Sequence, residues 1–174
     1  SYQYDPTTYT YTFTLRSGVL FSDGSAFTAA DAAATLRRAM SSDRYRTRLY
    51  QVTDVSGSGS TLTVVLSGPN TCFPALLDIP ILKSGTEKQD IPIGTGPYKL
   101  TSIDLATSAM LERNDDYRLA PAAIEKVELR YVGDRSTASV QLETGDLDIM
   151  SIDPSQLVSF ENNDKFTVEK VQTL

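Results

Sequence analysis

Alternating apolar and polar residues mark the strands of this chain. Between residues 10 and 16, Tyr11, Phe13 and Leu15 alternate with threonines and an arginine, which is the period-two pattern of a half-buried strand. Similar short segments predict six further strands, at residues 61–66, 98–103, 109–113, 126–132, 148–151 and 167–171. The chain is therefore expected to contain several short strands.

A different pattern follows the first strand and predicts a helix over residues 29–40. Thr28 stands three residues before Asp31, a spacing that favours a helix start, and good helix formers follow. Arg37 and Arg38 fall outside the apolar stripe. That stripe consists of Ala32, Thr35, Leu36 and Ala39. The many alanines indicate a helix packed closely on a sheet.

Weaker helical patterns predict a helix at residues 136–144, a helix at 155–161 and a short helix at 44–50. The first of these helices is expected to end at Gly145, because glycine commonly follows the last residue of a helix. With the strands predicted on either side of it, this helix forms an expected βαβ crossover.

Glycine and serine clusters predict the turns. The segment 56–60 reads Ser-Gly-Ser-Gly-Ser, and it is expected to form the flexible turn of a hairpin between residues 52–55 and 62–65. Gly94-Thr95-Gly96-Pro97 is expected to be a tight turn that needs glycine backbone torsions, with Tyr98 packing down after it. No helix follows this turn, so it does not read as a phosphate-binding loop.

Composition narrows the functional classes. With 174 residues, the chain is long enough for one ordinary domain, and 40% hydrophobic residues favour a folded core. The formal net charge of −6 disfavours nucleic acid and anionic membranes as partners. No apolar stretch approaches the length of a membrane span. The interleaved strands and helices predict an α+β or mixed α/β fold.

Reactive side chains are few. The absence of histidine removes Ser-His-Asp and Cys-His catalysis and histidine-based metal sites. Cys72 is the single cysteine, and we expect it to be a buried apolar residue beside Phe73. Asp115-Asp116 and the Asp146/Asp148 pair keep a carboxylate-based hydrolase open as an alternative, although the first pair reads as an exposed turn. No catalytic residue, metal site or cofactor is predicted.

Three motifs, in order, resemble those of the family 5 extracellular solute-binding proteins. Residues 13–31 carry Phe-Thr-Leu-Arg, then Asp23-Gly24, then Thr-Ala-x-Asp, and residues 93–100 read Ile-Gly-Thr-Gly-Pro-Tyr-Lys-Leu. Residues 111–149 carry Leu-Glu-Arg-Asn, a strand motif, and Leu-Glu-Thr-Gly-Asp-Leu-Asp-Ile. The resemblance implies structural rather than catalytic roles for Asp23, Gly24, Gly94, Thr95, Gly96, Pro97 and Tyr98.

This resemblance implies a periplasmic-binding-protein type II-like lobe with mixed sheets and packed helices. Residues 1–174 are then expected to be a partial N-terminal lobe of a two-lobe receptor, with no internal boundary. The implied function is the substrate-binding component of an ABC importer, which captures oligopeptides or similar small solutes outside the membrane and delivers them to a membrane permease. The implied location is periplasmic or extracellular, with a lipid anchor on the full-length protein. The absence of histidine weakens a nickel-binding reading for this segment.

The expected ligand contacts come from two regions that approach the cleft in such receptors. Aromatic rings with a polar tip suit a binding cleft, which favours Tyr45 and Tyr50. The stretch before the Gly-Thr-Gly-Pro-Tyr motif adds Asp78, Ile79 and Pro80. Two alternatives to the importer function remain open: a receptor-like sensor without transport, and the hydrolase.

Overall fold

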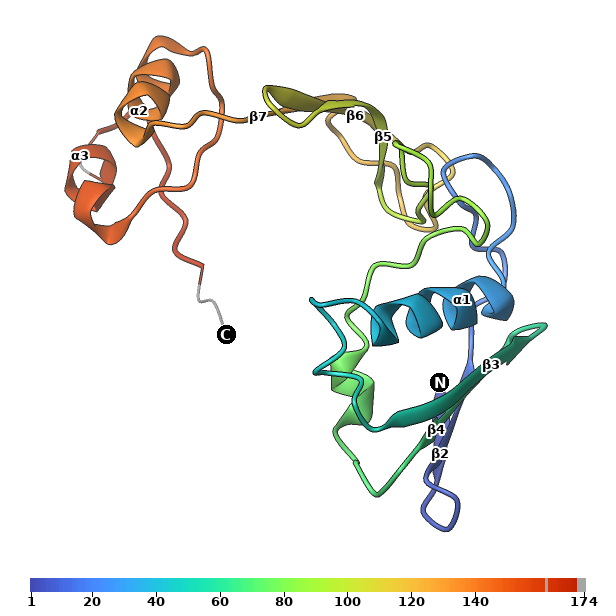
Figure 1. The fold of residues 1–174 in the computed structure, drawn as a ribbon. Coiled ribbons are helices and arrows are strands. Elements are labelled where there is room, and N and C mark those ends of the chain that lie inside the picture. Colours follow the sequence, from blue (N-terminus) through green and yellow to red (C-terminus); the bar gives the residue numbers. More distant parts are fainter. Residues whose placement is uncertain (162, 172–174) are drawn as a thin grey trace. The chain divides into compact units, whose positions relative to one another are not determined.

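The computed structural model describes residues 1–161 and 163–171. The chain divides into two compact units, Ser1–Arg130 and Tyr131–Leu174 (Figure 1). Both units combine short helices with extended segments, and all of the named sheets are antiparallel. The fold of the described residues is therefore α+β, which confirms the fold class predicted from the sequence.

The first unit begins with a four-stranded antiparallel sheet of order β1-β2-β4-β3. Its strands are β1 (Tyr2–Asp5), β2 (Thr10–Thr14), β4 (Thr61–Leu66) and β3 (Val52–Ser58). The predicted hairpin is confirmed, but β3 extends through Gly57 and Ser58, so only Gly59 and Ser60 form its turn. β1 was not predicted: its residues, Tyr-Gln-Tyr-Asp, do alternate, but the segment is only four residues long.

Register explains which side of this sheet is apolar. Tyr4 pairs with Tyr11, Tyr11 with Val64, and Val64 with Val55, so these four residues form one row across the sheet. Directly paired residues project to the same face. Tyr11, Val64 and Val55 are each at most 2% exposed, so this row faces the core.

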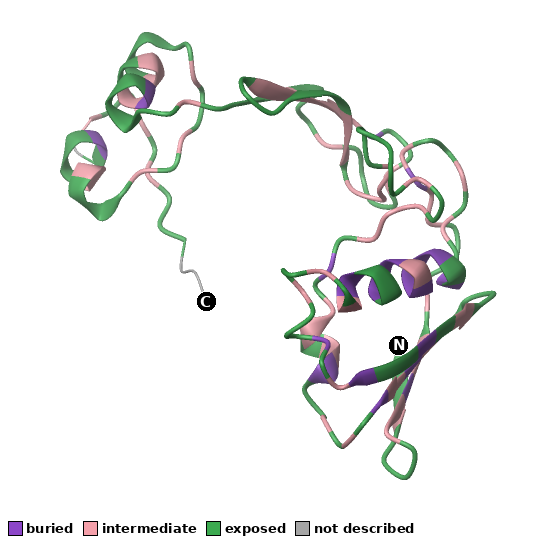
Figure 2. Ribbon diagram, viewed as in Figure 1, coloured by how far each residue is buried: buried purple, intermediate pink, exposed green. Residues whose placement is uncertain are grey.

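Helix α1 (Ala29–Met40) packs on β3 and β4, and its bounds are those predicted. Thr28 donates to the Asp31 carboxylate through its backbone N–H (2.9 Å) and its hydroxyl (2.6 Å), which fixes the helix start. The predicted apolar stripe is buried, and Arg37 and Arg38 are exposed. Figure 2 shows this burial concentrated on α1 and the strand beneath it.

Glycine at position 57 permits this close packing. Gly57 pairs with Leu62, which is 5% exposed, so position 57 faces the core side of the sheet. A Cβ atom built there would lie 2.0 Å from the carbonyl oxygen of Ala29. The first turn of α1 therefore rests directly on the β3 backbone, and the segment is a packing surface rather than a flexible linker.

After the short 3₁₀ helix η1 (Phe73–Leu76), the first unit ends in a second antiparallel sheet of order β5-β6-β7. Its strands are β5 (Tyr98–Asp104), β6 (Ser108–Arg113) and β7 (Lys126–Arg130), close to the predicted ranges. Asn114 follows β6 and is only 2% exposed.

The second unit contains α2 (Arg135–Thr144), η2 (Pro154–Gln156) and α3 (Leu157–Glu161), so the two predicted helices of this region are confirmed. Asp134 caps α2 by accepting the Thr137 backbone N–H at 2.7 Å. Gly145 has φ 84° and ends α2 in the left-handed conformation that glycine tolerates.

Three elements predicted from the sequence do not form. Residues 148–151 and 167–171 are irregular, so the predicted βαβ crossover is wrong. A strand needs a hydrogen-bonding partner as well as a suitable pattern, and neither segment has one among the described residues. Residues 44–50 form successive turns instead of a helix. The hydrogen bonds from Arg48 N and Leu49 N both end on the Tyr45 carbonyl, and the repeat does not continue.

Candidate functional site

An open pocket of about 330 Å³ lies beside the C-terminal half of α1. Its wall comes from four places in the first unit: α1, the turns after α1, the segment 79–82, and Pro92. The lining residues are Thr35, Arg38, Ala39, Ser42, Tyr45, Ile79, Pro80, Leu82 and Pro92. The volume is at the lower end of the range for small-molecule sites and suits one small group or side chain.

Five residues were predicted from the sequence to contact the ligand, and three of them line this pocket. Tyr45, Ile79 and Pro80 line the pocket. Tyr50 is 77% exposed and is not among the lining residues. Asp78 is also outside the lining, and its carboxylate pairs with the guanidinium of Arg48 at 2.5 Å. That solvent-exposed pair links the turns after α1 to the residue that precedes the segment 79–82.

Helix α1 holds the opposite side of the wall through Thr35. The Thr35 hydroxyl donates to the Leu82 carbonyl and accepts the Leu82 backbone N–H, both at 3.2 Å. One buried side chain thus satisfies both backbone groups of Leu82. These two hydrogen bonds tie Leu82, and with it the segment 79–82, to α1.

Tyr45 is held by two arginines. The guanidinium of Arg44 lies 5.5 Å and that of Arg48 lies 6.0 Å from the centre of the Tyr45 ring, within the range of cation–π attraction. Because Arg48 also pairs with Asp78, the ring is linked to the neighbouring segment. The aromatic wall is thereby oriented by charged groups that are not part of the pocket lining.

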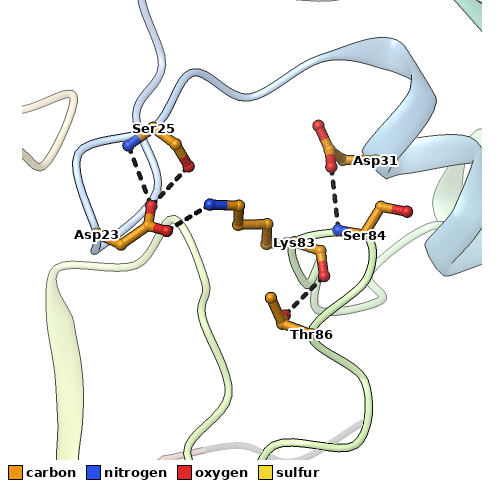
Figure 3. Close-up of polar contacts among 6 residues, drawn as sticks. All are labelled: Asp23, Ser25, Asp31, Lys83, Ser84 and Thr86. Atoms are coloured by element: carbon orange, nitrogen blue, oxygen red, sulfur yellow. Dashed lines mark hydrogen bonds and ion pairs between the residues drawn. The ribbon is translucent and has the colours of Figure 1, made fainter.

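A second polar network secures the segment after Leu82 (Figure 3). The Asp23 carboxylate accepts hydrogen bonds from Lys83 Nζ (2.5 Å), Ser25 Oγ (2.6 Å) and Ser25 N (3.0 Å). The Lys83 ammonium and the Ser25 donors lower the pKa of Asp23 from 3.8 to about 2. The motif residue Asp23 is thus an anchor for the chain at Lys83.

Asp31 contributes the other half of this network. Its carboxylate accepts the Ser84 backbone N–H at 3.0 Å in addition to the two donors of Thr28. Burial raises the pKa of Asp31, but the donors from Thr28 and Ser84 outweigh burial and the pKa is lowered. One carboxylate therefore caps α1 and ties it to the loop that continues from the pocket (Figure 3).

The Gly-Thr-Gly-Pro-Tyr motif has a structural role, but for a different reason from the one predicted. Neither Gly94 nor Gly96 has a positive φ, and an added Cβ would make only ordinary contacts at 3.8 and 3.7 Å. The expectation that the turn needs glycine torsions is therefore wrong. Its carbonyl groups are used instead: Gly94 accepts from Ser22 N (2.8 Å), and Gly96 accepts from Asn114 Nδ2 (2.9 Å).

The remaining motif residues also make structural contacts. The Tyr98 hydroxyl donates to the Ile124 carbonyl at 2.9 Å, and the Pro97 carbonyl accepts the Asn114 N–H at 2.9 Å. Gly24 has φ 78°, so the Asp23-Gly24 turn does use glycine's conformational freedom. Thr95 is half-buried.

The other chemical candidates are distributed on the surface. Cys72 is exposed, so the expectation that it is buried is wrong, and the adjacent Phe73 occupies the core instead. Asp115 and Asp116 lie in an exposed turn, as predicted.

Within residues 1–161 and 163–171, no group of three or more His, Cys, Asp or Glu side chains is placed to hold a metal ion. No helix in those same ranges has the length and apolar character to cross a membrane.

Solved structures of other proteins have the same fold as this chain. NikZ from Campylobacter jejuni, solved in complex with Ni(L-His), has a TM-score of 0.82 and 24% identity to the chain. The similar region covers 94% of this chain and 36% of NikZ. The predicted lobe fold is confirmed by this likeness.

The family is shown by sequence. The family "Bacterial extracellular solute-binding proteins, family 5 Middle" matches residues 1–174, so the chain belongs to the family 5 extracellular solute-binding proteins. A nickel-binding periplasmic protein of Escherichia coli is 31% identical over 156 residues, covering 81% of this chain and 30% of that protein. The glutathione-binding protein GsiB of Salmonella typhi is 30% identical over 151 residues, covering 79% and 30%. The chain thus spans less than a third of either curated relative, and both relatives are binding proteins.

Proposed function

We propose that this chain is part of the substrate-binding component of an ABC importer, which captures oligopeptides or similar small solutes outside the membrane and delivers them to a permease. The family match along the whole chain carries this proposal. Residues 1–174 then form part of the N-terminal lobe of a two-lobe receptor that is extracellular or periplasmic and lipid-anchored. The chain is a binding module and not an enzyme.

The pocket supports a role in holding solute. Its wall is tied to α1 by the hydrogen bonds of Thr35 with Leu82 and of Asp31 with Ser84. Apolar groups of Tyr45, Ile79 and Pro80 supply contact area without demanding one ligand shape. In a two-lobe receptor, hinge closure would bury a solute between such a wall and the other lobe, and the closed form would engage the permease.

One comparison favours a peptide. Glutathione, which the name of one relative gives as its ligand, is itself a tripeptide. A peptide also offers backbone groups that a receptor can bind whatever its side chains.

The test is calorimetric titration of the full-length protein with di- to pentapeptides, and with nickel chloride in parallel. We expect peptide binding that weakens about tenfold in Tyr45→Ala, because a large aromatic contact is lost. Tyr131→Ala is the matched control, since Tyr131 is 73% exposed and does not line the pocket. Binding of nickel without binding of any peptide would refute the peptide proposal.

Transport is tested separately, by uptake of a labelled peptide in cells with and without the gene. Loss of uptake on deletion supports the importer function. Tight binding with unchanged uptake would instead favour the sensor alternative.

A further inference from the structure

The pocket contains one charged side chain, Arg38, and its other walls are mainly apolar. The tyrosine, isoleucine, leucine and proline side chains present carbon to the space, and Thr35 already uses its hydroxyl on Leu82. Arg38 is exposed, so its guanidinium is accessible to a ligand. A small apolar space with a cation at one side is complementary to an apolar group that carries a negative charge.

The neighbouring arginines already have other interaction partners. Arg37, the other basic residue in the last turn of α1, donates to the Val55 carbonyl at 2.5 Å and so reaches toward β3. Arg48 pairs with Asp78, and Arg44 lies over the Tyr45 ring. Arg38 is therefore the cation that the pocket itself presents.

A second group points to an oxygen-bearing ligand. Ser42 lines the same pocket, and its hydroxyl oxygen accepts the Arg44 N–H at 3.3 Å. This leaves the hydroxyl proton to be donated to a ligand acceptor. A guanidinium and a hydroxyl donor four residues apart, at the end of one helix, can share the two oxygens of a carboxylate.

We propose that this pocket binds the carboxylate end of an amphipathic solute, with Arg38 and Ser42 receiving the carboxylate and the walls at Tyr45, Ile79 and Leu82 receiving the adjacent apolar side chain. For a peptide this is the free C-terminus with an aliphatic last residue. The inference rests on the proposed function, because it names the part of the solute that the same site recognises.

The experiment compares trileucine with its C-terminal amide, titrated by calorimetry into the full-length protein. We expect the free acid to bind about tenfold more tightly than the amide, since only the acid offers a charged acceptor. Arg38→Gln should remove this preference, and Arg38→Lys should retain part of it.

Arg118→Gln is the control for net charge. It removes the same positive charge from a residue that does not line the pocket, and the preference for the acid should survive in it. Equal binding of acid and amide, unaffected by Arg38→Gln, would overturn the carboxylate inference while leaving peptide binding intact. Failure of the wild-type protein to bind trileucine, its amide or any of the di- to pentapeptides would overturn the peptide proposal and this inference with it.

Discussion

The contact between β3 and the first turn of α1 depends on the absence of a side chain at position 57. In Gly57→Ala the new Cβ would lie 2.0 Å from the Ala29 carbonyl oxygen, 2.4 Å from its carbonyl carbon and 2.9 Å from Ala30 N. Ordinary van der Waals contact begins at 3.4 Å. The helix start must therefore move away from the strand by more than an ångström, and every atom it meets is backbone, which has no rotamer to change.

Overpacking a core of this kind costs about 1–3 kcal/mol. The movement also threatens the hydrogen bond from Ala29 N to the Gly59 carbonyl, 3.2 Å long, worth about 1 kcal/mol. Replacing glycine by alanine in a strand otherwise stabilises the folded protein by about 0.5–1 kcal/mol. Summing these terms, we therefore expect Gly57→Ala to lower the free energy of unfolding by about 1–3.5 kcal/mol.

Urea unfolding followed by circular dichroism measures this change. With a slope of about 2 kcal/mol per molar urea, the midpoint should fall by about 0.5–1.8 M. Gly68→Ala is the matched control, because an added Cβ there meets nothing within 4 Å and the residue does not have a left-handed φ. A Gly57→Ala midpoint equal to that of Gly68→Ala would show that the helix does not rest on the strand as described.

Three further predictions concern the polar contacts and the thiol. The folded-state pKa of Asp23 is about 2, below its ordinary value of 3.8. The Asp23–Lys83 pair should therefore stabilise the protein above about pH 4 and lose this contribution as the pH falls toward 2. Urea midpoints measured across this pH range should fall less steeply in Asp23→Asn than in the wild-type protein. Asn114→Ala should lower the unfolding free energy by about 1–3 kcal/mol, since it leaves the Gly96 carbonyl without its side-chain donor, and a thermal melt indistinguishable from wild type would contradict this. Cys72 should react with a thiol reagent in the native state as fast as in urea, because it is exposed, and marked protection in the native state would show that it is buried after all.

The sequence by itself determined the elements whose causes are local. The period-two pattern placed β4 at Thr61–Leu66, and the Thr28–Asp31 spacing placed the start of α1. These features depend on side chains within a few residues of one another. For the same reason the apolar stripe of α1 was readable, because helical periodicity decides which residues share a face.

Only part of the candidate site was readable in this way. Tyr45, Ile79 and Pro80 were predicted by region, whereas Thr35 was assigned to the core stripe and Pro92 was not singled out. The sequence did contain one signal for Arg38. It lies outside the apolar stripe of α1, so its side chain could face a surface other than the sheet. The pocket joins residues 35–45, 79–82 and 92, and no local pattern specifies which distant segments meet.

The tertiary structure decided everything that depends on a partner. Residues 167–171 alternate like a strand but have no strand to pair with among the described residues, so they stay irregular. Gly57 looked like part of a flexible turn, and only the position of α1 shows that its missing side chain is required. A pattern in the sequence states what a segment can do; pairing, close approach and burial are properties of two segments, and they exist only once the chain has folded.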